Sequence, residues 1–311
     1  MFKNSLRVTF LLNTLEIVNH IKNQTIVLLK FNTSVLHFFL LLEKETTMKS
    51  IKYFTALLSI LVLFSSCNSS DDSSPQQNPR TYQDVQNDFN SIEFVTGNND
   101  ITLEYANDYF WEFRVIMPDV DFTNNNRPLI ISLHGCANCQ SENPHLGTSC
   151  YVEEGYAALD AIIISPYSGN FLWYEVINQE KVLQLVDLAS DFLPVDTSKI
   201  VIEGYSDGGI GAWYFGESRP ETFSAAIPSA SYYDTTTNGI ARVMPIPMYV
   251  IHGENDTLFP LEDVEMWVQA SVDAGSDITL EVATGLDHYE PCNYVQYMEN
   301  AAAWLQNSVW N

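Results

Sequence analysis

The feature that most constrains this chain is the pentapeptide Gly-Tyr-Ser-Asp-Gly at residues 204–208. The β-branched run at 199–203 directly before it predicts a strand, and residues 208–218 after it predict a helix that ends before Pro220. A strand that turns at once into a helix leaves little space around the turn, and the flanking glycines relieve that crowding. We therefore expect the hydroxyl of Ser206 at an exposed apex, where the start of a helix favours developing negative charge.

The chain after about residue 100 alternates short apolar runs with helical periods. The apolar runs predict strands at residues 109–117, 128–133, 161–165, 199–203, 223–227, 248–251 and 278–282. The helical spacing predicts helices at residues 182–193, 208–218, 261–274 and 294–305. Such alternation predicts an α/β fold with a mostly parallel central sheet and helices on both faces. Ligands bind beyond the carboxyl ends of such strands, so the residues that follow strands are the candidates for chemistry.

A serine hydroxyl becomes a good nucleophile only when a neighbouring base takes its proton. The turn resembles that of the α/β-hydrolases, in which the acid and then the base follow the serine along the chain. Only His252 and His288 come after Ser206, and we interpret His288 as the base. His134 and His252 stand in His-Gly pairs at strand ends, which favours structural roles, and His145 lies in a predicted loop where it could be a surface residue.

The base in turn needs a carboxylate that fixes its tautomer and stabilises its charged form. Asp256 follows the predicted strand at 248–251 and is the candidate acid. Asp263 and Asp287 are alternatives. Asp263 falls inside a predicted helix, and Asp287 is adjacent to His288, so its side chain would tend to point away from the imidazole.

A tetrahedral intermediate needs backbone N–H donors around its negatively charged oxygen. The N–H of Asp207, directly after the serine, is one candidate donor. The N–H of Cys136, in the loop after the predicted strand at 128–133, is the other. Only the backbone is used at these positions, which leaves the side chains free to vary.

Several segments together carry a resemblance to a known superfamily. They are Leu-His-Gly-Cys at 133–136, Val-Asp-Thr-Ser-Lys-Ile at 195–200, Gly-Tyr-Ser-Asp-Gly-Gly at 204–209, Phe-Ser-Ala-Ala-Ile-Pro at 223–228, His-Gly-Glu-Asn-Asp-Thr at 252–257 and Asp-His at 287–288. Over about residues 101–308 the chain resembles the α/β-hydrolases, most of all the secreted feruloyl and acetyl esterases, polyhydroxybutyrate-depolymerase-like proteins and "predicted peptidases". Asp207 stands where relatives usually have Ala, Met or Gln. A carboxylate there opposes charge development unless its side chain points away.

The resemblance implies a serine carboxylesterase that forms an acyl-enzyme and uses no cofactor. Its substrates would be short-acyl or aromatic esters, such as acetyl or feruloyl esters on plant or algal polysaccharide. A serine peptidase of the same fold and a non-catalytic binding lipoprotein are the alternatives. The aromatic side chains of Tyr167, Trp173, Tyr232 and Tyr233 follow predicted strands and could stack on a sugar or phenolic ring, or they could pack in the core.

The N-terminal residues are interpreted as a targeting signal. From Met48, two lysines, an apolar run at 54–64 and two serines before Cys67 resemble a bacterial lipoprotein signal, in which Cys67 becomes lipidated. An ordinary cleaved signal peptide is the alternative. The domain division expected is 1–47 upstream mistranslation, 48–66 signal peptide, 67–80 flexible tether and 81–311 catalytic domain. The protein would then be exported and lipid-anchored to the cell envelope, with its soluble domain outside the cytoplasm.

Net charge limits the kinds of binding partner, and cysteine content indicates disulfides. The chain has 39 acidic residues and 14 basic ones, a net charge of −25, which repels phosphate backbones and argues against nucleic acid. Membrane contact is expected only through the anchor. Four cysteines remain after Cys67, and in an oxidising compartment they suggest two disulfides in one of three pairings. The set is Cys136, Cys139, Cys150 and Cys292. A zinc site built from Cys136, Cys139, His145 and Cys150 is the alternative, and we expect no metal.

Overall fold

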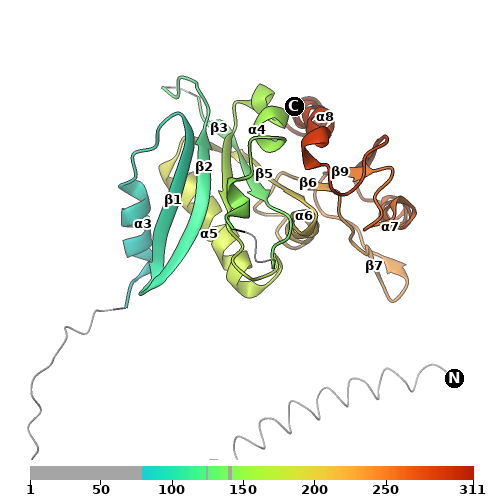
Figure 1. Ribbon diagram of the computed structural model, residues 1–311, viewed down its shortest axis with the longest axis horizontal. Helices are drawn as coiled ribbons and strands as arrows, with labels where there is room; N and C mark the ends of the chain where they lie inside the picture. Colours follow the sequence, from blue (N-terminus) through green and yellow to red (C-terminus); the bar gives the residue numbers. More distant parts are fainter. Residues whose placement is uncertain (1–78, 124, 139–141) are drawn as a thin grey trace, which may run out of the picture. The chain divides into compact units, whose positions relative to one another are not determined.

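The computed structural model describes residues 79–123, 125–138 and 142–311 (Figure 1). The expected signal peptide, the anchor at Cys67 and nearly all of the tether lie outside these residues. Within the described part, no helix has both the length and the apolar character needed to cross a bilayer.

An eight-stranded sheet with the order β1-β2-β4-β3-β5-β6-β9-β10 forms the centre of the domain. Its strands are β1 Gly97–Ala106, β2 Tyr109–Met117, β3 Arg127–Leu133, β4 Ile162–Pro166, β5 Val195–Tyr205, β6 Ala225–Ser229, β9 Met248–Gly253 and β10 Ile278–Ala283. Strand β2 is antiparallel to both of its neighbours, and every other adjacent pair in this sheet is parallel. The predicted mostly parallel α/β sheet is confirmed.

Helices cover both faces of this sheet. The principal ones are α3 Tyr82–Asn90, α4 Val152–Gly155, α5 Val176–Phe192, α6 Asp207–Ser218, α7 Leu261–Asp273 and α8 Val295–Trp304. Buried side chains of α3, α5, α6 and α7 share one apolar core cluster with strand residues. Those of α4 and α8 share a second cluster with other residues of the same strands. Alternate residues of a strand point to opposite faces, so the two clusters are the two sides of one sheet.

Three features lie beyond the sequence prediction. Helix α3 begins at a capping box between Thr81 and Asp84 and buries Val85 and Phe89. Strand β1 then pairs with β2 at the sheet edge next to α3 (Figure 1). A small hairpin, β7 Thr236–Thr237 with β8 Ile240–Ala241, projects near α7.

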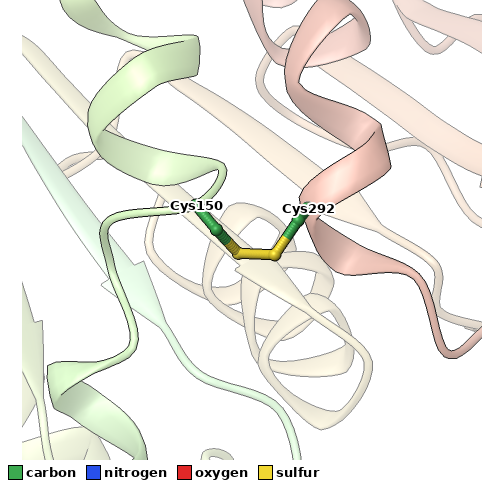
Figure 2. The surroundings of a disulfide bond; sticks show 2 residues. All are labelled: Cys150 and Cys292. Atoms are coloured by element: carbon green, nitrogen blue, oxygen red, sulfur yellow. A yellow bond between two sulfur atoms is a disulfide. The ribbon is translucent and has the colours of Figure 1, made fainter.

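A disulfide joins Cys150 to Cys292 across 142 residues of sequence (Figure 2). Cys150 lies just before α4, and Cys292 lies in the short 3-10 helix Pro291–Tyr294 before α8. This is one of the three pairings that the sequence allows. Cys136 is also disulfide-bonded, and Cys139 lies outside the described residues. The zinc alternative is wrong, because one of its four ligands, Cys150, is bonded to Cys292.

Candidate active site

The turn between β5 and α6 holds Ser206 in a strained conformation, with φ 56° and ψ −119°. Two glycines make the turn possible. A Cβ atom on Gly204 would lie 2.2 Å from the carbonyl oxygen of Gly208, and one on Gly208 would lie 1.8 Å from that of Leu133. Real side chains do not tolerate such contacts, so glycine is required at both positions. The result is a partly exposed serine side chain at the carboxyl edge of the sheet.

Three side chains from distant parts of the sequence form one hydrogen-bonded line. The hydroxyl of Ser206 lies 2.9 Å from Nε2 of His288, and Nδ1 of His288 lies 2.9 Å from Oδ2 of Asp256. Because a carboxylate only accepts, the Nδ1–H of His288 donates to Asp256. Nε2 is then the acceptor for the hydroxyl proton of Ser206, which is the arrangement that general-base activation of a serine requires.

The carboxylate of Asp256 is held from both oxygens. Its side chain is fully buried, and its Oδ1 accepts the backbone N–H groups of Leu258 and Phe259 at 2.9 and 2.8 Å. Burial alone would raise the pKa of Asp256, but the hydrogen bonds from His288 and Phe259 and the nearby histidine charges outweigh it and hold this pKa below its usual value. Asp256 therefore stays ionised beside His288.

Two tyrosines position the loop that carries His288. The hydroxyl of Tyr205, next to Ser206, donates to the carbonyl of His288 at 2.8 Å, and the hydroxyl of Tyr294 donates to that of Asp287 at 3.0 Å. The carboxylate of Asp287 accepts the backbone N–H of Tyr289 and so turns away from the imidazole. Of the three candidate carboxylates, Asp256 is the one that His288 contacts.

The other histidines of the domain are buried. Nε2 of His134 accepts the N–H of Ser168, and burial lowers the pKa of His134 to about 4. Nε2 of His252 bonds to the carbonyl of Phe259, and burial likewise lowers the pKa of His252. His145, for which the sequence allowed a surface position, is 4% exposed and packs against the ring of Tyr167.

The loop after β3 lies directly against the serine. A Cβ atom on Gly135 would be 3.2 Å from Cβ of Ser206, so the backbone that leads into Cys136 adjoins the turn. Cys136 itself has a positive φ of 56°. The side chain of Asp207 points toward this loop, because its Oδ2 accepts the backbone N–H of Ala137 at 3.0 Å. The two backbone segments expected to carry the oxyanion donors are thus linked by that carboxylate.

Comparisons with known proteins agree with this architecture. Residues 173–310, which contain all three members of the hydrogen-bonded line, match the dienelactone hydrolase family. The chain has the α/β-hydrolase fold. Fold neighbours include the fluorophosphonate-binding serine hydrolase FphF of Staphylococcus aureus, at a TM-score of 0.56 and 15% identity over 68% of this chain and 100% of that one. Esterase Est2 of Thermogutta terrifontis aligns at a TM-score of 0.55 and 18% identity over 68% and 94%.

A curated relative resembles part of this chain in sequence. The bifunctional acetylxylan esterase/xylanase XynS20E of Neocallimastix patriciarum is 26% identical over 148 residues, which are 45% of this chain and 21% of that protein. The chain therefore spans about a fifth of that relative's length. The solved neighbours are less than 25% identical to this chain, and they establish its fold.

The four aromatic residues predicted for substrate binding occupy different environments in the structure. Trp173 is 1% exposed, and its indole N–H donates to the carbonyl of His134, so the prediction that it stacks on substrate is wrong and it braces the loop after β3. Tyr233 stacks on Trp213, and Tyr167 packs between two histidine rings. Tyr232 is 42% exposed and lines a pocket beside the site.

Two kinds of residue around the site were not singled out from the sequence. Phe259 and Trp267 line the same pocket as Tyr232. The sequence pattern that could have revealed them is a pair of aromatic residues at the two ends of a short loop-to-helix segment after Asp256. Glu203 lies fully buried on β5, three residues before the serine, where burial raises its pKa to about 8. A charged residue inside an apolar strand is a recognisable signal of such a group.

Proposed function

We propose that this α/β-hydrolase is a serine carboxylesterase that hydrolyses short-acyl or aromatic esters through an acyl-enzyme. The observation that carries the proposal is the continuous line from the Ser206 hydroxyl through His288 to the buried carboxylate of Asp256, with both links at 2.9 Å. The acetylxylan esterase named above supports the ester as the bond that is cleaved, and acetyl groups on polysaccharide as substrates.

In the first half of the proposed reaction, the oxygen of Ser206 attacks the ester carbonyl carbon while Nε2 of His288 takes the hydroxyl proton. The carbonyl oxygen becomes an oxyanion, which accepts hydrogen bonds from the backbone N–H groups of Cys136 and Asp207. His288 then gives its proton to the departing alcohol oxygen, and the acyl group stays on Ser206. Asp256 stabilises the imidazolium between these two transfers.

In the second half, water attacks the acyl carbon and His288 takes one of its protons. The new tetrahedral species expels the oxygen of Ser206, which recovers its proton from His288, and the acid leaves. Every proton therefore passes through the same imidazole nitrogen. No cofactor is needed for either half.

A peptidase would use the same three side chains on an amide, and a binding lipoprotein would not turn over either bond. A fluorophosphonate probe separates catalysis from binding, because it reacts only with an activated serine. We expect the wild-type chain to be labelled and Ser206→Ala to remain unlabelled, while Ser198→Ala, at an exposed serine on β5, is labelled normally.

Substrate turnover then shows whether the enzyme cleaves an ester or an amide bond. We expect p-nitrophenyl acetate to be hydrolysed, with kcat reduced by about 10⁴-fold or more in Ser206→Ala. A panel of peptide nitroanilides should stay unhydrolysed. Faster cleavage of the nitroanilides than of the esters would make the chain a peptidase, and absence of labelling and of turnover together would leave the binding function.

We also propose that the catalytic domain works outside the cytoplasm, tethered to the cell envelope by lipidated Cys67. The disulfide between Cys150 and Cys292 supports an oxidising compartment. Metabolic labelling with a palmitate analogue should mark the wild-type protein and not Cys67→Ser. Mass analysis of the native protein tests the start of the chain, because a peptide from residues 1–47 would contradict Met48 as the first residue.

A further inference from the structure

A pocket of about 290 Å³ lies next to the proposed acid–base pair. Its lining residues come from the loops after β6 and β9 and from α7. They are Tyr232, Leu258, Phe259, Pro260, Asp263 and Trp267. The volume is close to the lower limit of small-molecule sites and suits one ring.

Phe259 connects this pocket to the proposed catalytic base. Its ring meets the ring of His288 edge-on, with centroids 5.1 Å apart. Its backbone N–H donates to Asp256 and its carbonyl bonds to His252, so this wall is fixed in place. The ring of Phe259 thus lines the pocket and also contacts the imidazole of His288.

The sheet order places the pocket and the loop with Cys136, one of the proposed oxyanion donors, on opposite sides of Ser206. The loop with Cys136 follows β3, which flanks β5 on one side. Tyr232 follows β6, and the remaining lining residues follow β9, both of which lie on the other side of β5. A carbonyl whose oxygen points toward Cys136 thus directs another substituent toward the pocket.

The chemistry of the reaction identifies that substituent. His288 must protonate the oxygen of the leaving alcohol, so this oxygen lies within hydrogen-bond reach of Nε2. The alcohol part of the ester consequently lies on the His288 side, where the pocket is. An aromatic acyl group such as feruloyl would sit away from this pocket.

The lining selects the kind of alcohol. Tyr232 presents its ring 4.8 Å from that of Phe259 and 6.0 Å from that of Trp267, which offers apolar ring faces. The carboxylate of Asp263 accepts hydrogen bonds and repels anions, and none of the lining residues is basic. A ring with C–H faces and several hydroxyl groups suits this lining, because its faces can pack on the aromatic rings and its hydroxyl groups can donate to Asp263. Tyr232 and Leu258 are 42% and 48% exposed, so the rim is open to a longer chain.

We propose that this pocket is the alcohol-side subsite of the enzyme and that it binds a neutral sugar ring carrying the ester, with Asp263 accepting its hydroxyl groups. The inference rests on the proposed esterase function. Beyond that function, it assigns the pocket to the alcohol side of the ester, and it assigns Trp267 and Asp263 a role in substrate specificity.

The test compares two acetate esters that share an acyl group and differ in the alcohol. One is a mono-acetylated methyl β-D-xylopyranoside, and the other is ethyl acetate, which has no ring. Trp267→Ala should lower kcat/KM about tenfold or more on the sugar ester and change it by less than twofold on ethyl acetate. Asp263→Asn should lower it about fivefold on the sugar ester alone. Met266→Ala, at an exposed neighbour on α7, and Glu262→Gln are the matched controls.

Three results would overturn the inference while leaving the esterase function intact. Equal losses on both esters would mean that Trp267 and Asp263 only support the fold. A Trp267→Ala effect that grows from ethyl acetate to ethyl hexanoate would place the acyl chain in the pocket. A wild-type preference for acetylcholine over the sugar ester, lost in Asp263→Asn, would make the ligand a cation. Failure of the proposed function itself looks different, because the wild-type chain would then hydrolyse neither ester and would not react with the fluorophosphonate.

Discussion

Removing the charge of Asp207 should speed up the proposed reaction. The carboxylate of Asp207 has two opposing effects. It accepts the N–H of Ala137 at 3.0 Å and so ties the loop after β3 to the start of α6. It also places a negative charge next to the position where an oxyanion would develop. Asp207→Asn separates these effects, because its amide oxygen can still accept the N–H of Ala137 while the charge is gone.

The size of the effect follows from Coulomb's law. An oxyanion bound by Cys136 would lie about 3 Å from that N–H. Ala137 is the next residue, and its N–H is the one that Asp207 accepts, so the two negative charges lie on the order of 5 Å apart. Their repulsion is then about 3 kcal/mol at an effective dielectric constant of about 20, and about 1 kcal/mol in water. Asp207 is partly exposed, which favours the lower half of this range, about 1–2 kcal/mol or roughly a 5- to 30-fold gain in kcat.

The assay is steady-state hydrolysis of p-nitrophenyl acetate in low and high salt. Asp207→Asn should exceed the wild type at low salt, and the gain should shrink at high salt because salt screens charges that face solvent. Asp207→Ala, which loses the tie to Ala137 as well, should be slower than Asp207→Asn. Asp119→Asn, at an exposed site, should behave as the wild type. A kcat for Asp207→Asn at or below that of the wild type would refute the reasoning, since the charge would then not oppose the reaction.

Three further predictions concern stability. Glu203 has a pKa of about 8 in the folded chain against an ordinary value of 4.5, so the folded state keeps a proton that the unfolded chain releases as pH rises from about 4.5 to 8. The free energy of unfolding of the wild type, relative to that of Glu203→Gln, should therefore fall by on the order of 4 kcal/mol across that window. Urea midpoints of both proteins at pH 5 and pH 8 measure this change. Midpoints that change equally with pH in the two proteins would contradict the prediction. Replacing Cys150 and Cys292 by serine should lower the free energy of unfolding by up to about 5 kcal/mol for a loop of 142 residues, and no change in the thermal midpoint would be inconsistent with the bond. Gly208→Ala should abolish phosphonate labelling and soluble expression together, whereas Gly239→Ala, which meets no atom within 4 Å, should cost about 1 kcal/mol.

The sequence predicts the inner strands of the sheet because these are largely buried and hence continuously apolar, and β4, β6 and β9 are buried along their whole length. Residues 248–251 and 278–282 fall inside β9 and β10, and the turn at Ser206 is marked by glycines that no other residue can replace. Helix α3 escaped prediction because it buries only Val85 and Phe89, too few apolar positions for a recognisable period. Strand β1 escaped for a similar reason, since its residues alternate between partly buried and exposed at the sheet edge.

Side-chain environment is harder to read than backbone. Trp173 and Tyr232 both follow strands in aromatic stretches, yet Trp173 is 1% exposed and Tyr232 is 42% exposed. The difference depends on Gly211 of α6, whose missing Cβ leaves space for Trp173. That is a contact between residues 38 positions apart, and nothing in either local sequence reports it.

The histidines show why a chemical role cannot be assigned from residue type alone. His134, His252 and His288 all lie near the carboxyl edge of the sheet, and all three are buried. What separates them is the partner of Nε2. In His134 this nitrogen accepts a backbone N–H, and in His252 it bonds to a backbone carbonyl. Both contacts shape loops.

In His288 the same nitrogen faces the hydroxyl of Ser206, while Nδ1 is committed to Asp256. A backbone group bonded to Nε2 does not exchange its proton during a reaction, whereas a serine hydroxyl can give up its proton and regain it. The imidazole that contacts an exchangeable proton on one side and a buried carboxylate on the other is therefore the one equipped for proton transfer. The two loop-shaping histidines hold the backbone on which that geometry depends, since His252 fixes Phe259 and Phe259 in turn donates to Asp256.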